Sequence, residues 1–189
     1  MKRKIFLLVI FGIIVLFLWN VTAITHTYGP YMGKVVDAET GEPIEGAVVF
    51  FVFFTAAPNP GGSSTKVAHA VEVLTDIRGE FSIPAQKITL FRFLHGWEKD
   101  GFVTIFKPGY GAFPGHSDSG PKYEISYSLP ENTYWTVKLP KLKSFKEKKD
   151  NLGNLFIPGS EEIPLHKRKL ILDLHNEERR SLGFGPVSR

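Results

Sequence analysis

The residues of this 189-residue chain that could do chemistry are few and poorly grouped. The chain has no cysteine, which excludes thiol catalysis, disulfides, cysteine-ligated zinc and iron–sulfur clusters. The segment Gly115-His116-Ser117-Asp118-Ser119-Gly120 places an imidazole, hydroxyls and a carboxylate together, but it is not the Gly-x-Ser-x-Gly elbow of a hydrolase. His116 and Asp118 are close enough to share a metal ion, yet they need further ligands. We therefore predict no catalytic site, no metal site and no cofactor.

Three aromatic residues are the candidate binding residues. Trp97, Tyr110 and Phe113 fall at expected loops or strand ends, where rings can stack on a sugar or contact a partner protein. A solvent-exposed, coplanar set of these rings would favour a carbohydrate ligand. The alternative is that the same rings roof one end of the fold and bind nothing.

The N-terminus carries the targeting signal. Lys2, Arg3 and Lys4 precede an uninterrupted apolar run over residues 5–19, and small residues follow at 21–23. This order is typical of a secretory signal, and the basic flank predicts that the rest of the chain is exported to the periplasmic or extracellular face. Two outcomes stay open: cleavage after residues 1–23, or retention of residues 5–24 as an anchor in the inner membrane.

The distribution of charge argues against nucleic acid as a partner. The whole chain has a formal net charge of +4. Residues 24–140 hold 9 basic and 12 acidic groups, whereas residues 141–189 hold 11 basic and 7 acidic groups. A nearly neutral body with a mildly basic tail lacks the concentrated basic face that nucleic-acid binding needs.

Short apolar segments separated by turn residues predict an all-β domain. Residues 25–30 read as a polar bridge, residues 55–66 as a flexible loop, and residues 84–101 as a helical turn or a loop. After the expected β domain, residues 141–149 form a charged run that we interpret as a solvated linker or a segment attracted to anionic lipid. The expected strands cover residues 32–37, 47–54, 67–75, 80–83, 103–106, 123–129 and 134–139.

Three segments in this order resemble the carboxypeptidase regulatory-like family. They are GKVVDAETGEPIEGAVV at residues 33–49, TDIRGEFSIP at residues 75–84 and VTIFKPGY at residues 103–110. The resemblance covers residues 31–141 and implies a transthyretin-like or Ig-like β-sandwich of seven strands. Members of that family are usually accessory or interaction modules, and a shared fold does not carry activity with it. The enzymatic relatives of this fold, the transthyretin-like hydrolases, end in Tyr-Arg-Gly-Ser, whereas this chain ends in Gly-Pro-Val-Ser-Arg.

The second expected strand is apolar on both faces. Its residues Phe50, Phe51, Val52, Phe53 and Phe54 need cover on the side that a plain sandwich leaves in water. Three candidates for that cover are residues 86–101, through Phe91, Phe93 and Trp97, a partner protein, and an expected helix over residues 165–182. That helix would contribute Leu170, Ile171 and Leu174 and end at Gly183 in an αL cap.

The sequence thus divides into residues 1–23, a signal peptide or anchor, residues 31–141, a β-sandwich, and residues 142–189, a basic linker and helix. We expect a non-catalytic module of the cell envelope that binds a protein partner. A module that binds a carbohydrate or another small ligand is the alternative, and a transthyretin-like hydrolase is a distant third. The membrane is a further partner if the N-terminal segment is retained.

Overall fold

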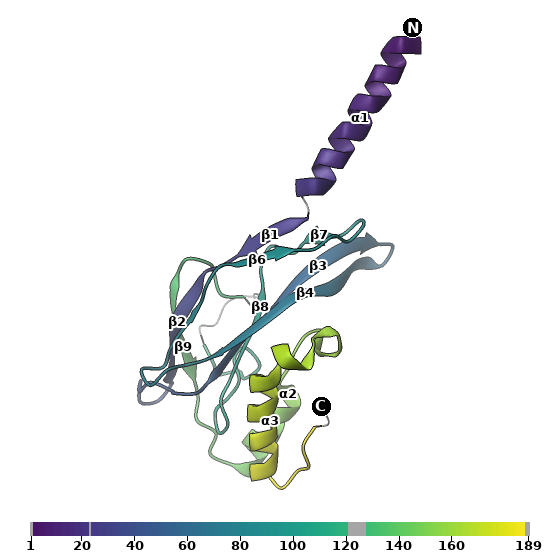
Figure 1. The fold of residues 1–189 in the computed structure, drawn as a ribbon. Coiled ribbons are helices and arrows are strands. Elements are labelled where there is room, and N and C mark those ends of the chain that lie inside the picture. Colours follow the sequence, from purple (N-terminus) through teal and green to yellow (C-terminus); the bar gives the residue numbers. More distant parts are fainter. Residues whose placement is uncertain (1, 23, 121–127, 188–189) are drawn as a thin grey trace.

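The computed structural model describes residues 2–22, 24–120 and 128–187. Within these residues, nine strands form open sheets and three α-helices flank them, as Figure 1 shows. The strands lie in two layers, and two of the helices pack against one of those layers. The fold is therefore mostly β and sandwich-like, as the sequence predicts, although nine strands are present where seven were expected.

The first layer contains a long ladder that is interrupted once. β1 (Thr25–Tyr28) pairs with β6 (Gln86–Thr89), and β2 (Tyr31–Asp37) pairs with β5 (Glu80–Ile83) in the same antiparallel register. Pro30 and Pro84 stand at the interruption, where neither can donate a ladder hydrogen bond. β9 (Tyr134–Leu139) lies parallel to β2 on its other side.

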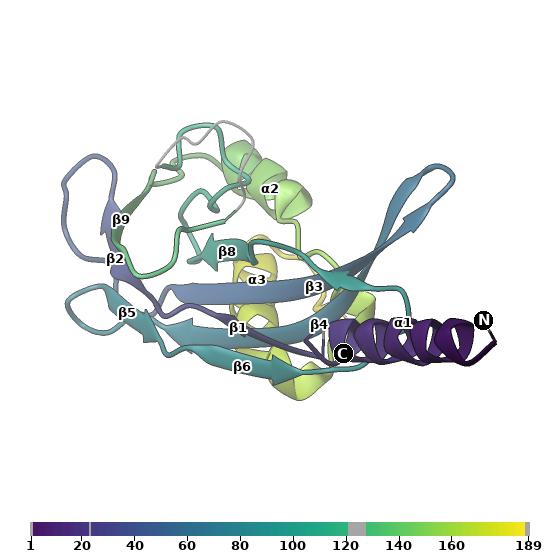
Figure 2. The ribbon, with the colours of Figure 1, turned by 90° about the horizontal axis from the view of Figure 1, so that it is seen from above.

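The second layer is built around β3 (Val48–Asn59). It pairs along its length with β4 (Gly62–Leu74), and on its other side with β8 (Phe102–Phe106) and the two-residue β7 (Gly96–Trp97). The β3–β4 hairpin extends beyond the rest of the sandwich in Figure 2. Residues 55–66 are thus strand and tight turn, not the expected flexible loop. Residues 84–101 hold β6 and β7, not a helical turn.

The two layers meet across an aromatic core. Phe51 of β3 stacks on Tyr31 with ring centroids 4.2 Å apart, and Phe53 stacks on Tyr28 at 4.4 Å. All four side chains are buried, and they share one cluster with residues of β5, β8 and β9. Alternation along β3 places Phe51 and Phe53 in this core and sends Phe50 and Val52 to the opposite face.

That opposite face of β3 is covered by the chain's own C-terminal segment. Val48, Phe50 and Val52 are fully buried against a layer that contains α2 (Phe145–Asn154) and α3 (Lys169–Ser181). The expected contribution of the tail helix is confirmed: Ile171 is fully buried, and Leu170 and Leu174 pack beside it. The cover expected from residues 86–101 is wrong, because Phe91 and Phe93 are exposed and Trp97 packs against the cluster between the two layers.

Buried and half-buried hydrogen bonds attach the tail to the sandwich. The Glu72 carboxylate of β4 accepts hydrogen bonds from the backbone N–H groups of Leu170 (2.8 Å) and Ile171 (3.0 Å), at the start of α3. A carboxylate is favoured there because the first N–H groups of a helix lack partners and carry partial positive charge. From α2, the Asn151 side chain accepts from the Ala112 N–H at 2.8 Å and donates to the Tyr110 carbonyl at 3.1 Å.

Residues 145–149 of the charged run begin the helix α2 and do not form a solvated linker. The Ser144 side chain accepts from the Glu147 N–H, and the Glu147 carboxylate accepts in return from the Ser144 N–H, which forms a capping box at the start of α2. Two 3₁₀ turns, Ser160–Glu162 and Leu165–Lys167, lead into α3. Gly183 ends α3 with φ of +78°, and the Phe184 N–H bonds to the Arg179 carbonyl, as expected for a glycine cap.

The N-terminal helix α1 (Lys2–Thr22) stands apart from the sandwich in Figure 1. Its apolar side chains from Ile5 to Val15 are largely exposed. Among the residues that the structure describes, no helix combines the length and apolarity that a membrane span requires. The polar bridge expected after it is the strand β1. The expected edge strand at Tyr123, Ile125 and Tyr127 lies outside the described residues.

Candidate functional site

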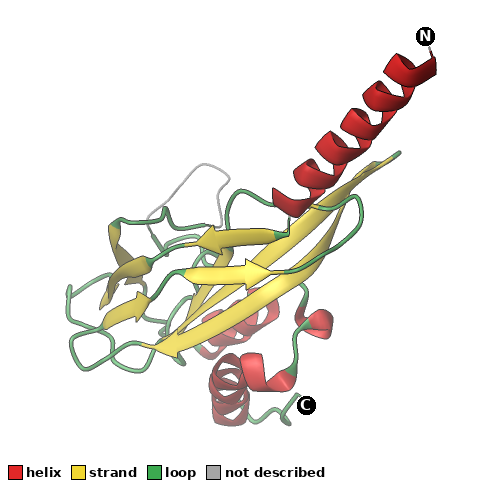
Figure 3. Ribbon diagram, turned by 45° about the horizontal axis from the view of Figure 1, so that its top comes forward, coloured by secondary structure: helices red, strands yellow, loops and turns green. Residues whose placement is uncertain are grey.

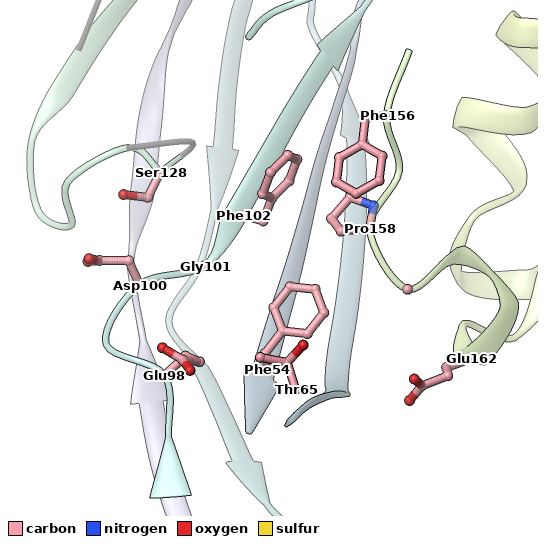
Figure 4. A pocket seen from close by; sticks show the side chains of 11 residues that line it. Phe54, Thr65, Glu98, Asp100, Gly101, Phe102, Ser128, Phe156, Pro158 and Glu162 are labelled. Atoms are coloured by element: carbon pink, nitrogen blue, oxygen red, sulfur yellow. The ribbon is translucent and has the colours of Figure 1, made fainter. Parts of the chain in front are cut away.

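A cleft of about 700 Å³ opens between the β3–β4 hairpin and the segment that follows α2. Figure 4 shows three phenylalanine rings in it, with Glu98 and Asp100 on one side of the rings and Glu162 on the other. Five separate stretches of chain build the walls. The residues that line it are Phe54, Thr65, Glu98, Asp100, Gly101, Phe102, Ser128, Phe156, Pro158, Gly159 and Glu162.

Two of the rings belong to strands of the second layer, and the third belongs to the tail. Phe54 is the last residue of the aromatic run in β3, and Phe102 begins β8. Phe156 belongs to the tail, and its ring meets the Phe102 ring edge to face, with centroids 5.7 Å apart. The Thr104 hydroxyl donates to the Phe156 carbonyl at 3.1 Å, which fixes the tail segment there. Phe156 is 64% exposed, so its face is available to a ligand.

Two glycines allow the walls to approach one another. A Cβ at Gly101 would lie 2.6 Å from the Phe53 ring, so only glycine lets the chain between Asp100 and Phe102 pass over that ring. Gly159 has φ of +66°, and a Cβ there would lie 2.3 Å from the Val67 side chain. Both positions require glycine for the cleft to keep its shape.

The charge of the cleft is negative. Glu98, Asp100 and Glu162 contribute carboxylates, and no lysine or arginine is among the described residues that line it. One Glu162 oxygen accepts from the Val67 N–H at 3.1 Å. Burial raises the pKa of the Tyr28 phenol, and the negative charges of Glu98, Glu131 and Asp100 raise that pKa further. Acidic groups beside exposed rings are suited to a cationic ligand.

The three aromatic residues singled out from the sequence are not brought together. Tyr110 follows β8 near the Val48 end of β3, whereas Trp97 pairs with Thr55, roughly 20 Å further along that strand. Trp97 is half-buried and stacks on His26 with ring centroids 5.6 Å apart. The Tyr110 phenol is hydrogen-bonded to the Asp37 carboxylate, and burial together with that carboxylate raises its pKa.

Phe113 is a core residue and not a surface ring. Its backbone N–H and C=O both bond to Ile105 at 2.9 Å, and this draws the side chain between the layers, where it is only 2% exposed. Trp97, Tyr110 and Phe113 therefore do not form the exposed, coplanar set that would favour a carbohydrate ligand. Phe113 is buried because its backbone pairs with β8, and the sequence did not reveal this pairing.

The side chains of His116 and Ser117 make hydrogen bonds only within their own loop among those that the structure describes. The His116 ring accepts a hydrogen bond from the Asp118 N–H at 3.1 Å, and the Ser117 hydroxyl is 3.3 Å from the Asp118 carboxylate. Across the described part of the chain, no three histidine, aspartate or glutamate side chains are grouped so that they could hold a metal ion.

Sequence reasoning missed the acidic cleft because its walls come from residues between 54 and 162. The one local signal is the segment Trp97-Glu98-Lys99-Asp100-Gly101-Phe102, where two acids and a glycine interrupt an aromatic stretch. Comparisons with protein-family models, with curated proteins and with solved structures each found no match to this chain.

Proposed function

We propose that the chain is a non-catalytic binding module of the cell envelope. Its acidic cleft takes a basic, partly apolar segment of a partner protein. The observation that carries this proposal is the grouping of three carboxylates with the rings of Phe54, Phe102 and Phe156 in one open cleft. Lysine and arginine side chains suit such a surface because their cationic ends pair with carboxylates and aromatic faces while their stems pack on the rings.

We further propose a carboxypeptidase regulatory-like, transthyretin-like identity for the sandwich. The three segments that carry the resemblance fall on β2 and the start of β3, on the β4–β5 turn, and on β8 with its following turn. The Asp37 carboxylate accepts from the Glu39 and Thr40 N–H groups in the first of these turns, and Asp76 accepts from Arg78 and Glu80 in the second. These local contacts support the proposal because they account for the turn residues on which it depends.

The binding proposal predicts the outcome of a titration with a short peptide of alternating arginine and leucine. Replacing Glu98 by Gln together with Asp100 by Asn is expected to weaken its affinity about tenfold, or about 1.4 kcal/mol, since a half-buried and an exposed carboxylate are neutralised. Binding to the unaltered protein should also weaken as salt is added. Isothermal titration calorimetry at two salt concentrations measures both effects.

A matched control changes the same net charge away from the cleft. Glu45→Gln with Glu177→Gln alters two exposed carboxylates that do not line it and should leave the affinity nearly unchanged. Equal weakening by both pairs would show that net charge alone attracts the peptide and would overturn the cleft as its site. Binding of a neutral oligosaccharide, lost on Phe156→Ala, would favour the carbohydrate alternative instead.

We also propose that the sandwich is exported, on the evidence of the basic residues 2–4 and the apolar run that follows them. A reporter that is active only outside the cytoplasm, fused after Arg189, should be active in cells. Replacing the three basic residues and breaking the apolar run with Leu8→Arg and Ile13→Arg should abolish that activity. A fusion that is active only as a cytoplasmic reporter would contradict export.

A further inference from the structure

The loop between β6 and β7, residues 90–95, has the reverse of the usual polarity for a loop in water. Phe91, Phe93 and Leu94 are 61%, 71% and 71% exposed. Between the two phenylalanines, Arg92 turns inward: its guanidinium donates to the Thr55 hydroxyl at 2.8 Å and to the Val67 carbonyl at 2.7 Å. The arginine is thus held against the β3–β4 hairpin, and the apolar side chains are directed outward.

The backbone conformation of this loop also directs its apolar side chains outward. Leu94 has φ of +60°, a conformation that a bulky side chain adopts at a cost. The His95 N–H bonds to the Arg92 carbonyl at 3.2 Å, and the His95 ring lies 2.9 Å from the Phe93 carbonyl oxygen. Packing of Leu94 within the chain does not explain the strained turn, because the side chain is mostly exposed. Backbone strain clusters at functional sites, and grouped exposed apolar side chains mark interaction surfaces.

The position of the loop identifies that contact. The Leu90 N–H bonds to the Ile24 carbonyl at 2.8 Å, only two residues after α1 ends at Thr22. Figure 1 shows β6, β7 and α1 at the same end of the molecule, away from the tail helices, and Figure 3 shows the long N-terminal helix on the opposite side of the strands from the C-terminal helices. The exposed apolar side chains of α1 and of the loop therefore meet one environment. Residues 86–97 also include Lys87 and no acidic residue, which suits a surface of anionic headgroups.

We propose that residues 90–95 are a membrane-contact loop, which inserts Phe91, Phe93 and Leu94 into the headgroup and upper acyl region of a lipid bilayer. Aromatic and leucine side chains are favoured at that depth, and Lys87 remains at the level of the headgroups. The loop would fix the orientation of the sandwich on the membrane, so that the β4–β5 turn faces away. The inference rests on the proposed envelope location, and it does not depend on what the cleft binds.

The absence of cysteine makes a direct test possible in the full chain. Single variants Phe93→Cys, Phe11→Cys in α1 and Ile77→Cys in the distant β4–β5 turn would each carry an environment-sensitive fluorophore. The chain is reconstituted in vesicles of zwitterionic and anionic phospholipid at a low ratio of protein to lipid. We expect the label at Phe93 to shift its emission to the blue and to be quenched about twofold by lipids with a nitroxide near the headgroup. Ile77 is 74% exposed and provides the matched control, because its label should stay water-like.

The outcomes distinguish the membrane-contact loop from contact of α1 alone with the membrane. A lipid-quenched label at Phe11 with a water-like label at Phe93 would overturn the membrane-contact loop but keep the helix at the membrane. A blue shift at Phe93 without quenching by lipid would also overturn it, since a second copy or the protein itself would then cover the ring. Quenching at Phe93 alone would support the loop and contradict the contact of α1 with lipid.

Discussion

Removal of residues 143–189 is expected to leave a domain that no longer stays monomeric in solution. The deletion uncovers the outer face of β3 and β8, where Val48, Phe50, Val52 and Phe106 are fully buried. Burying one such side chain contributes about 1.5–3 kcal/mol. Uncovering four of them removes a contribution comparable to the whole free energy of unfolding of a domain, about 5–15 kcal/mol. Size-exclusion chromatography of the refolded fragment, together with circular dichroism, measures the loss.

A compensating substitution distinguishes this cause from a general failure to fold. Phe50→Ser with Val52→Thr in the deleted chain makes the uncovered face more polar and should recover part of the soluble monomer. In the intact chain, Ile171→Ala is expected to cost about 2–5 kcal/mol, because it leaves a cavity in the same layer. A truncated chain that remains monomeric with unchanged thermal stability would show that the tail is not an essential cover.

Phe50→Ala and Phe51→Ala are expected to be equally damaging, at about 3–5 kcal/mol each. The two neighbouring residues point to opposite faces of β3, and both are fully buried: Phe51 between the sheets and Phe50 under the tail. In a sandwich without the tail layer, the outward residue would be exposed and its loss would cost little. Urea denaturation of each variant gives the free energy of unfolding.

Phe91→Ala provides the control for these two variants, because its ring is mostly exposed in the β6–β7 loop. Its unfolding free energy should change by no more than about 0.5 kcal/mol. A Phe50→Ala variant that behaves like Phe91→Ala would contradict the three-layer packing. Equal losses at Phe50 and Phe51 would support it.

Strand positions were predictable where a strand is half-buried or fully buried. β5 and β9 match their expected bounds, because Phe81 with Ile83 and Val137 with Leu139 alternate clearly. Prediction failed where pairing is set by a distant partner. β1 was read as a polar bridge, since Thr25, His26 and Thr27 become strand residues only by pairing with β6. α2 was read as a linker because its core contacts, Asn151 and Leu152, are few among charged neighbours.

The candidate site was less predictable than the fold. Single residues with suitable chemistry are visible in a sequence, but their grouping is not. Trp97, Tyr110 and Phe113 lie within a short stretch of chain, yet the register of β3 with β7 and β8 separates the first from the other two. Phe54, Asp100 and Phe156, which are distant in the sequence, line one cleft.

The sequence by itself determined the apolar N-terminal segment, the mainly β character of the body, the absence of thiol chemistry and the need to cover both faces of the Phe50–Phe54 strand. Each of these follows from local composition or from a two-residue alternation, which needs no knowledge of distant partners. Tertiary structure alone decided that the chain's own tail supplies the cover, that Phe113 belongs to the core, and that Glu98, Asp100 and Glu162 share a cleft. The physical reason is that burial and electrostatic grouping depend on which segments pack together, and many pairings are compatible with the same local pattern.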